Sequence, residues 1–154
     1  PREGPRGRPR PRQRPRPEGR CGGGGGQLTR GVVARHADAS NFGGKPHEWQ
    51  HKAEVLQQHC RDVGRDYDEI RKTISCEVFI RETEQEVLDA GSRSFWGEPA
   101  ESWRAGNPGG PPGQGAGEIR AYVDLGCTGF YPWCSDYPDT ETLRLFAAVA
   151  AELR

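Results

Sequence analysis

A His-Glu-x-x-His pattern is the most specific catalytic signature in the chain. In zinc proteases two histidines one helical turn apart bind the metal and the glutamate activates water, and His47, Glu48 and His51 match that arrangement. Apolar residues recur at four- and three-residue steps along the same predicted helix and define its buried face: Trp49, Ala53, Leu56, Cys60 and Val63. This places both histidines on the opposite, solvent side. The pattern therefore favours an exposed histidine pair, and we expect no metal site.

Aromatic and polar residues gather in the segment Trp133-Cys134-Ser135-Asp136-Tyr137, directly after the last predicted strand. Loops at that end of the strands form the active-site face of a (β/α)₈ barrel, so Trp133, Asp136 and Tyr137 are candidates for lining a pocket. The alternative is that Trp133 and Tyr137 pack at the barrel rim. Cys134 has neither a nearby histidine nor a basic neighbour, which argues against a nucleophilic thiolate.

Five cysteines occur without any Cys-x-x-Cys pair, an odd number that fits neither a disulfide framework nor a zinc ribbon. We expect reduced thiols, with Cys60 and Cys76 as small core residues. No apolar run approaches the ~20 residues of a membrane-spanning helix, and the start of the chain lacks the apolar region of a signal peptide. The sequence thus predicts a cytoplasmic protein without a membrane partner.

Charge is distributed unevenly along the 154 residues, although the formal net charge is zero. Residues 1–20 carry eight arginines and two glutamates and no aliphatic or aromatic side chain, which predicts a disordered tail. Arginines could neutralise nucleic-acid phosphates, but without aromatic residues to stack on bases we favour a solvated tail and no specific nucleic acid. The chain begins at Pro1 and contains no Met, so we expect a fragment.

Helical and strand patterns alternate after the tail. The expected helices are 27–37, 46–63 with Gly64 as its stop, 83–90, 118–125 and one that Asp139 caps, with Leu143, Phe146, Val149, Ala150 and Leu153 inward. The expected strands are 37–42, 73–80 and 127–133, and the Gly/Pro-rich stretch 105–117 is expected to be a linker. This order is typical of βαβ units around a parallel sheet, and four units make about half of a (β/α)₈ barrel.

Three segments in order resemble the luciferase-like oxidoreductases of the F420-dependent class: Gly22–Phe42, His51–Thr73 and Tyr122–Ala147. The resemblance implies the C-terminal half of a (β/α)₈ barrel, residues 21–154, that binds coenzyme F420, or alternatively FMN, at the C-terminal ends of its strands. It also implies a monooxygenase or oxidoreductase activity with hydride transfer to or from a small organic substrate. The cofactor-binding residues that it implies are Gly23, Gly24, Gly25, Gly26 and Asn41.

The chain departs from this family in two places. The Ile/Leu-rich strand that should precede the glycines is missing, because residues 14–21 read RPRPEGRC, and Gly26 stands where the family commonly has an acidic residue. The family's Gly-Thr-Pro-Glu helix start is replaced by Gly106-Asn107-Pro108-Gly109. The first half of the barrel is also absent. The alternative function is therefore a non-catalytic remnant or a partner-binding half barrel, whose exposed strand edges need a homo-oligomer or the missing N-terminal half.

Overall fold

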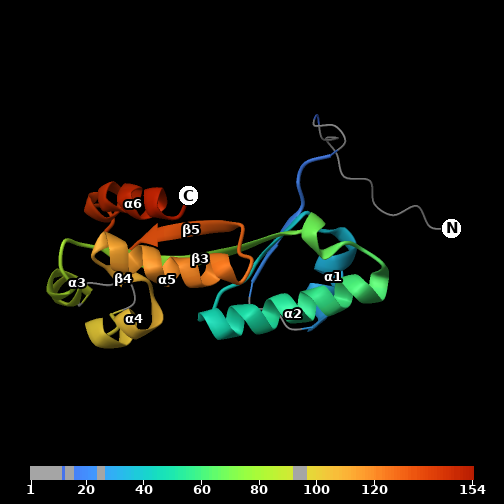
Figure 1. Ribbon diagram of the computed structural model, residues 1–154, viewed down its shortest axis with the longest axis horizontal. Helices are drawn as coiled ribbons and strands as arrows, with labels where there is room; N and C mark the ends of the chain where they lie inside the picture. Colours follow the sequence, from blue (N-terminus) through green and yellow to red (C-terminus); the bar gives the residue numbers. More distant parts are fainter. Residues whose placement is uncertain (1–11, 13–15, 24–26, 92–96) are drawn as a thin grey trace.

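A parallel sheet flanked by helices forms the body of the computed structural model, which describes residues 12, 16–23, 27–91 and 97–154 (Figure 1). Five strands and their helices follow one another along the chain as β1 (Arg20–Gly22), α1 (Gln27–His36), β2 (Ala39–Asn41), α2 (Pro46–Val63), the short 3₁₀ helix η1 (Tyr67–Glu69), β3 (Arg71–Ile80), α3 (Glu84–Gly91), α4 (Ala100–Gly106), β4 (Gly109–Gly110), α5 (Pro112–Asp124), β5 (Gly129–Cys134) and α6 (Glu141–Glu152). The prediction of an α/β fold with a parallel sheet is confirmed.

Strand β3 is the long central strand to which the others attach. Its residues Arg71–Thr73 pair with β2, Thr73–Val78 pair with β5, and Phe79–Ile80 pair with β4, in each case in parallel. β1 extends the sheet on the far side of β2. The order across the main sheet is therefore β1-β2-β3-β5, with β4 beside the end of β3.

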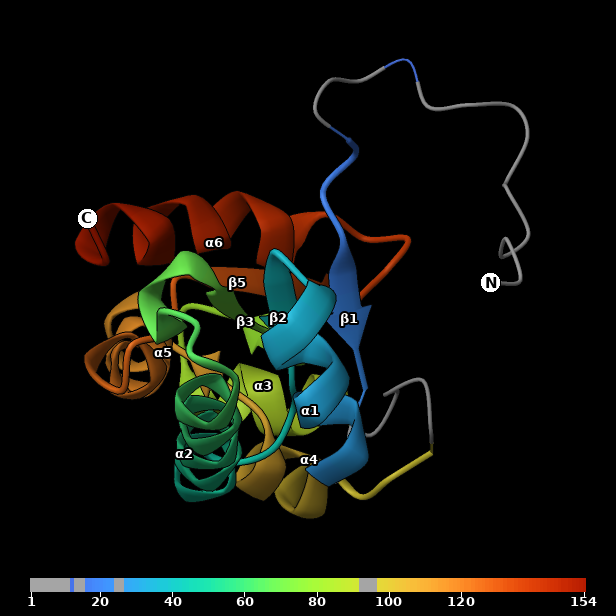
Figure 2. The same cartoon turned by 90° about the vertical axis from the view of Figure 1, so that its right-hand side faces the viewer.

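The two faces of the sheet have different characters because side chains alternate along a strand. Ile74 and Ile80 point to one face, where they pack into hydrophobic clusters with residues of α1, α2, α5 and α6. Figure 2 shows these four helices around the outside of the strands. The opposite face, called the inner face here, carries mainly polar and aromatic side chains: Arg20, Arg71, Thr73, Ser75, Glu77, Tyr131 and Trp133. Phe79 is also on this side and packs against Trp103 of α4, with ring centroids 6.1 Å apart.

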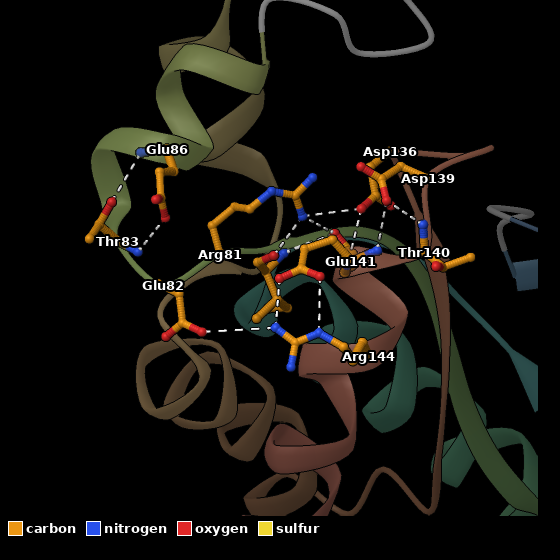
Figure 3. Close-up of polar contacts among 11 residues, drawn as sticks. Arg81, Glu82, Thr83, Glu86, Asp136, Asp139, Thr140, Glu141 and Arg144 are labelled. Carbon is orange, nitrogen blue, oxygen red and sulfur yellow. Dashed lines mark hydrogen bonds and ion pairs between the residues drawn. The ribbon is translucent and has the colours of Figure 1, made fainter.

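Local sequence signals place helices α2 and α3 correctly. α2 spans 46–63 as predicted, with proline in its first turn and Gly64 in the left-handed conformation at φ 67°. His47 and His51 lie on its exposed face, as expected. At the start of α3, Thr83 and Glu86 exchange the two hydrogen bonds of a capping box, at 3.0 and 3.3 Å (Figure 3).

Strand β1 corrects one prediction, since the strand that the sequence lacks is present in short form. Arg20–Gly22 pairs with β2, and Gly19 accepts backbone hydrogen bonds from Asp38 and Ala39. The Asp38 carboxylate also accepts from the Gly19 N–H at 2.7 Å and from Arg16. Pairing with an existing edge therefore imposes strand geometry on residues that have no local preference for it. Most of the tail predicted for 1–20 lies outside the described residues.

The Gly/Pro-rich stretch 105–117 is a second correction, because it is the end of α4, all of β4 and the first turns of α5 rather than a linker. Pro112 suits the first turn of a helix, where its missing N–H costs no hydrogen bond. Gly115 is buried against Ile80 and Val149, so its small size permits close contact between α5, β3 and α6. Glycine here serves packing rather than flexibility.

Two helices bury their apolar residues only in part. On α1, Val33 is buried but Leu28 is 90% exposed and Val32 is half exposed. On α6, Val149 is buried as predicted, whereas Leu143 is 59% exposed and Leu145 is buried instead. The helix from Ala100 to Gly106 was not predicted from the sequence. Among the described residues, no helix combines the length and apolar character needed to cross a membrane.

Two glycines of α5 provide a matched test of this packing. A Cβ at position 115 would lie 2.8 Å from Ile80 Cδ1, whereas one at position 117 would meet no atom within 4 Å. We expect Gly115→Ala to lower the free energy of unfolding by about 1–3 kcal/mol through overpacking. Gly117→Ala should raise it by about 0.5–1 kcal/mol, since alanine is the better helix former. Urea denaturation measures both, and equal effects would contradict the close packing of Gly115.

Candidate functional site

Asn41 is the last residue of strand β2 and lies at the end of the sheet where the parallel strands have their C-termini. Its side-chain nitrogen Nδ2 donates to Ser75 Oγ at 3.2 Å, and its side-chain oxygen Oδ1 accepts from Thr73 Oγ1 at 3.0 Å. Both partners are inner-face residues of β3, and the pair of bonds fixes which way the amide points. Thr73 and Ser75 were not predicted as site residues, although their alternation on a strand was a signal that could have identified them.

The glycine run Gly22–Gly26 connects the end of β1 to the start of α1. Gly22 pairs with Asn41, and the Gly23 N–H donates to the Asn41 carbonyl at 3.2 Å, with Gly23 at a positive φ of 114°. Gly24, Gly25 and Gly26 lie outside the described residues. A Cβ at Gly22 or Gly23 would meet no atom within 4 Å, so this end of the strand has open space beside it.

A strand followed by glycines and then by a helix start is an arrangement that suits an anionic group. The first N–H groups of a helix have no partner within it, and the helix dipole favours negative charge there. The first turn of α1 contains no acidic residue that would repel an anion. The described part of this segment therefore fits a phosphate.

A cavity of about 440 Å³ lies beside β3, where that strand changes partners. β2 pairs with β3 only as far as Thr73, and β4 pairs with β3 only from Phe79. Both strands lie on the same edge of β3, because the Thr73 carbonyl and the N–H groups of Phe79 and Arg81 all point to this side. Among the described residues, no strand covers the edge between these positions. The cavity occupies this gap, and its lining includes Ser75, Cys76, Glu77, Lys45, Glu48, Asn107 and Trp133.

Of the three pocket candidates, Trp133 is the one that reaches the cavity. It lies on β5 opposite Glu77 and is 62% exposed. Glu77 is held in place, since one of its carboxylate oxygens accepts from Trp103 Nε1 at 2.6 Å and from Ser135 Oγ at 3.1 Å. Tyr137 is 75% exposed and does not line this cavity. Glu77 and Trp103 were not predicted, and Trp103 comes from a helix with no clear signal in the sequence.

The turn between β2 and α2 forms the other wall of the cavity. Gly44 has a φ of 112°, and a Cβ there would lie 2.6 Å from Glu48 Oε2. That oxygen accepts from the Lys45 N–H at 2.9 Å, and the Tyr122 hydroxyl donates to the Gly44 carbonyl at 3.1 Å. Only glycine fits this turn without strain. The wall is thus rigid, and it presents Lys45 and Glu48 to the cavity.

The thiols near the cavity are poor nucleophiles. Burial raises the pKa of Cys76 from 9.0 to about 12, and it also raises the pKa of Cys134. A thiol with a raised pKa is almost entirely protonated at neutral pH, and the thiolate is the reactive form. Cys60 is buried in the core as predicted, whereas Cys76 is only partly buried and reaches the cavity.

Asp136 does not line this cavity and has a structural role. Its side chain is 4% exposed, pairs with Arg81 at 3.1 Å and accepts from the Thr142 N–H at 2.8 Å, at the start of α6 (Figure 3). Arg81 Nη1 also donates to the Thr142 hydroxyl at 2.9 Å and to the Ile80 carbonyl at 2.8 Å. Asp139 accepts from the Thr140 N–H at 2.6 Å and from the Glu141 N–H at 3.1 Å, but the N-cap residue of α6 is Thr140 instead of the predicted Asp139. Asp136 therefore connects β3 to α6.

Removal of the Asp136 carboxylate tests this structural role. We expect Asp136→Ala to lower the free energy of unfolding by about 3 kcal/mol, because it leaves the mostly buried Arg81 without its counter-charge. The double variant Arg81→Met with Asp136→Ala should regain part of the loss. Thermal denaturation measures both proteins. A double variant that is less stable than the single one would show that Arg81 is not left uncompensated.

Alkylation rates test the state of Cys76. With a pKa of about 12 instead of 9.0, its thiolate fraction in the folded chain is roughly a thousandfold lower than in the unfolded chain. We expect iodoacetamide to label Cys76 slowly at pH 8 and faster in urea, with the rate in the folded protein rising through pH 9–10. Peptide mass spectrometry reads out the site. Labelling at the same rate in both states would contradict a buried, neutral thiol.

The sequence matches no protein-family model and no curated protein. Solved structures nevertheless share its fold. An F420-dependent secondary alcohol dehydrogenase in complex with an F420-acetone adduct is 13% identical over 88% of this chain and 48% of that chain, with a TM-score of 0.71. A riboflavin lyase with modified FMN and riboflavin is 16% identical over 88% of this chain and 42% of that chain, with a TM-score of 0.65.

The coenzyme F420-dependent tetrahydromethanopterin reductase from Methanopyrus kandleri is 14% identical over 87% of this chain and 48% of that chain, with a TM-score of 0.58. The chain thus spans less than half the length of each of these enzymes. At such identities the likeness concerns the fold. The chain has the α/β architecture, with a parallel sheet and outer helices, that forms part of these three enzymes.

Proposed function

We propose that this chain forms the last four βα units of a luciferase-like (β/α)₈ barrel and belongs to an oxidoreductase that uses coenzyme F420, with FMN as the alternative. The observation that carries the proposal is the meeting of several features at one end of a parallel sheet: the glycines after β1, Asn41 at the end of β2, Ser75 and Glu77 on β3, and Trp133 on β5. Cofactors bind at this end of the strands in barrels of this kind. The fold shared with a structure that contains an F420-acetone adduct and one that contains modified FMN supports the choice of cofactor.

The proposed roles follow from what each group offers. The glycine run and the start of α1 would hold the cofactor phosphate, because they combine open space with N–H groups that have no helical partner. The cofactor, when bound, supplies the hydride chemistry. Asn41 and Ser75 would orient it through hydrogen bonds from a fixed network, and Trp133 would provide an apolar wall.

The chain's share in the reaction is positioning. Cys76 and Cys134 are neutral thiols, and Glu77 already accepts hydrogen bonds from Trp103 and Ser135. We therefore assign none of them as nucleophile or base. The small organic substrate would occupy the cavity beside β3. Five free cysteines suit a reducing compartment, so we place the protein in the cytoplasm.

A non-catalytic half barrel that binds a partner is the second candidate function. Tyr131 and Trp133 are 40% and 62% exposed on the inner face, where an entire barrel would enclose them. Exposed aromatic surface of this kind is typical of a docking site. This candidate predicts a folded chain that binds no cofactor by itself.

Fluorescence titration of the purified chain with F420, and separately with FMN, distinguishes the two candidates. We expect saturable binding that Asn41→Ala weakens about fivefold, since it removes a hydrogen-bonding group worth about 1 kcal/mol. His47→Ala, on the exposed face of α2, is the matched control and should bind as the unaltered chain does. A folded sample that binds neither cofactor would support the non-catalytic half barrel and refute the oxidoreductase.

A further inference from the structure

The inner face of the sheet carries exposed aromatic side chains. Ser75 lies opposite Tyr131 and Glu77 opposite Trp133, so β3 and β5 form a row of polar and aromatic side chains. α3 and α4 reach this face at its C-terminal end, where Trp103 contacts Phe79 and Glu77. Tyr131 and Trp133 nevertheless stay accessible. Burial of aromatic side chains is energetically favourable, so we expect another polypeptide to cover this face.

The sheet is curved around its inner face. Arg20 of β1 donates to the Tyr131 hydroxyl of β5, and its guanidinium carbon lies 4.9 Å from the Tyr131 ring centroid, although β2 and β3 lie between these strands. Side chains from the two ends of a flat sheet of this order would not meet, because neighbouring strands are about 4.8 Å apart. The curvature is that of a barrel wall.

Besides the gap along β3, the outer strands β1 and β5 each have one open edge in the described structure. β1 pairs with β2 alone, and β5 pairs with β3 alone. Both strands run in the same direction. The N–H of Ser135 donates to β3, and the backbone groups of successive residues point alternately to the two edges of a strand. The backbone groups of Phe130, Pro132 and Cys134 therefore point away from β3, to the open edge of β5. Pro132 lacks an N–H to donate there, but Phe130 and Cys134 keep theirs. Open edges of this kind tend to pair with another chain.

We propose that two copies of this chain close one barrel, a proposal that rests on the proposed function. Each copy contributes β1, β2, β3 and β5, and β5 of one copy pairs with β1 of the other at two equivalent seams. Twice four parallel strands is the strand number of a (β/α)₈ barrel. The two-fold arrangement pairs the outer edges of β1 and β5 in both copies.

This assembly also completes the candidate site. At each seam the C-terminal end of β5, with Trp133, lies beside the C-terminal end of β1 from the partner subunit, where the glycine run begins. Trp133 of one copy would then lie at one cofactor site with Gly22 of the partner subunit and Gly23 of the partner subunit. The site is incomplete in a single copy, because no strand of the described part pairs with the outer side of β5. Cofactor binding should therefore require the dimer.

Light scattering after size-exclusion chromatography tests the assembly over a range of protein concentrations. We expect a particle of twice the 17.0 kDa of one chain. Trp133→Glu places a charge on the enclosed face and should weaken dimerisation at least about a hundredfold, as for a residue at the centre of an interface. Leu143→Glu is the matched control: Leu143 is similarly exposed, at 59%, but lies on α6 outside the inner face, and its variant should stay dimeric. Circular dichroism verifies that both variants fold.

The outcomes separate this inference from the proposed function. A folded monomer at all concentrations would overturn the two-copy barrel and leave the inner face to a different polypeptide. A dimer that Trp133→Glu does not weaken would overturn it as well, because another surface would then hold the copies together. A dimer that Trp133→Glu dissociates but that binds neither F420 nor FMN supports the assembly and refutes the oxidoreductase. A monomer that binds cofactor keeps the oxidoreductase and refutes the assembly.

Discussion

The backbone hydrogen bonds along β3 are the constraint on which the rest of the molecule depends. One edge of this strand bonds to β2 near its start and to β4 near its end, and the other edge bonds to β5. Its side chains join the hydrophobic clusters in the same way, with Ile74, Ile80 and Phe79 each in a different one. A strand buried along most of its length thus holds together clusters that have few residues in common.

The change of partners along β3 also creates the functional surface. If one strand covered the whole edge, Ser75 and Glu77 would lie beside another backbone and the cavity would be closed. The gap instead lets the turn around Gly44, the segment after α4 and Trp133 approach the same stretch of β3. The sheet gives up several ladder hydrogen bonds there. A ligand with polar groups can take up that bonding capacity, which is why the cavity is a more convincing site than a surface depression.

The inner face is the basis of both candidate functions, the oxidoreductase and the partner-binding half barrel. In a complete barrel the same residues fill the interior and form the floor of the cofactor site. Arg20 and Tyr131 already meet across the face of one copy, so its curvature is set by the chain itself. The closure of the barrel, by contrast, depends on what lies against β1 and β5. Folding, assembly and cofactor binding are therefore linked through one surface.

The sequence by itself determined the elements whose signals are local. Pro46, Gly64 and the apolar spacing between them define α2, and the β-branched run from Thr73 defines β3, because each residue there acts on its own backbone or on a neighbour one turn away. The position of Asn41 at a strand end followed from the same local pattern.

Only the tertiary structure decided the elements made by distant contacts. β1 is a strand because β2 offers it an edge, and the glycines of α5 are helical because Gly115 packs on Ile80, 35 positions earlier. Asp136 joins Arg81 across 55 residues and so lies outside the cavity, and Leu143 is exposed because α6 turns Leu145 and Thr142 inward. These outcomes depend on side-chain volume and charge brought together by folding, which spacing along one segment cannot specify.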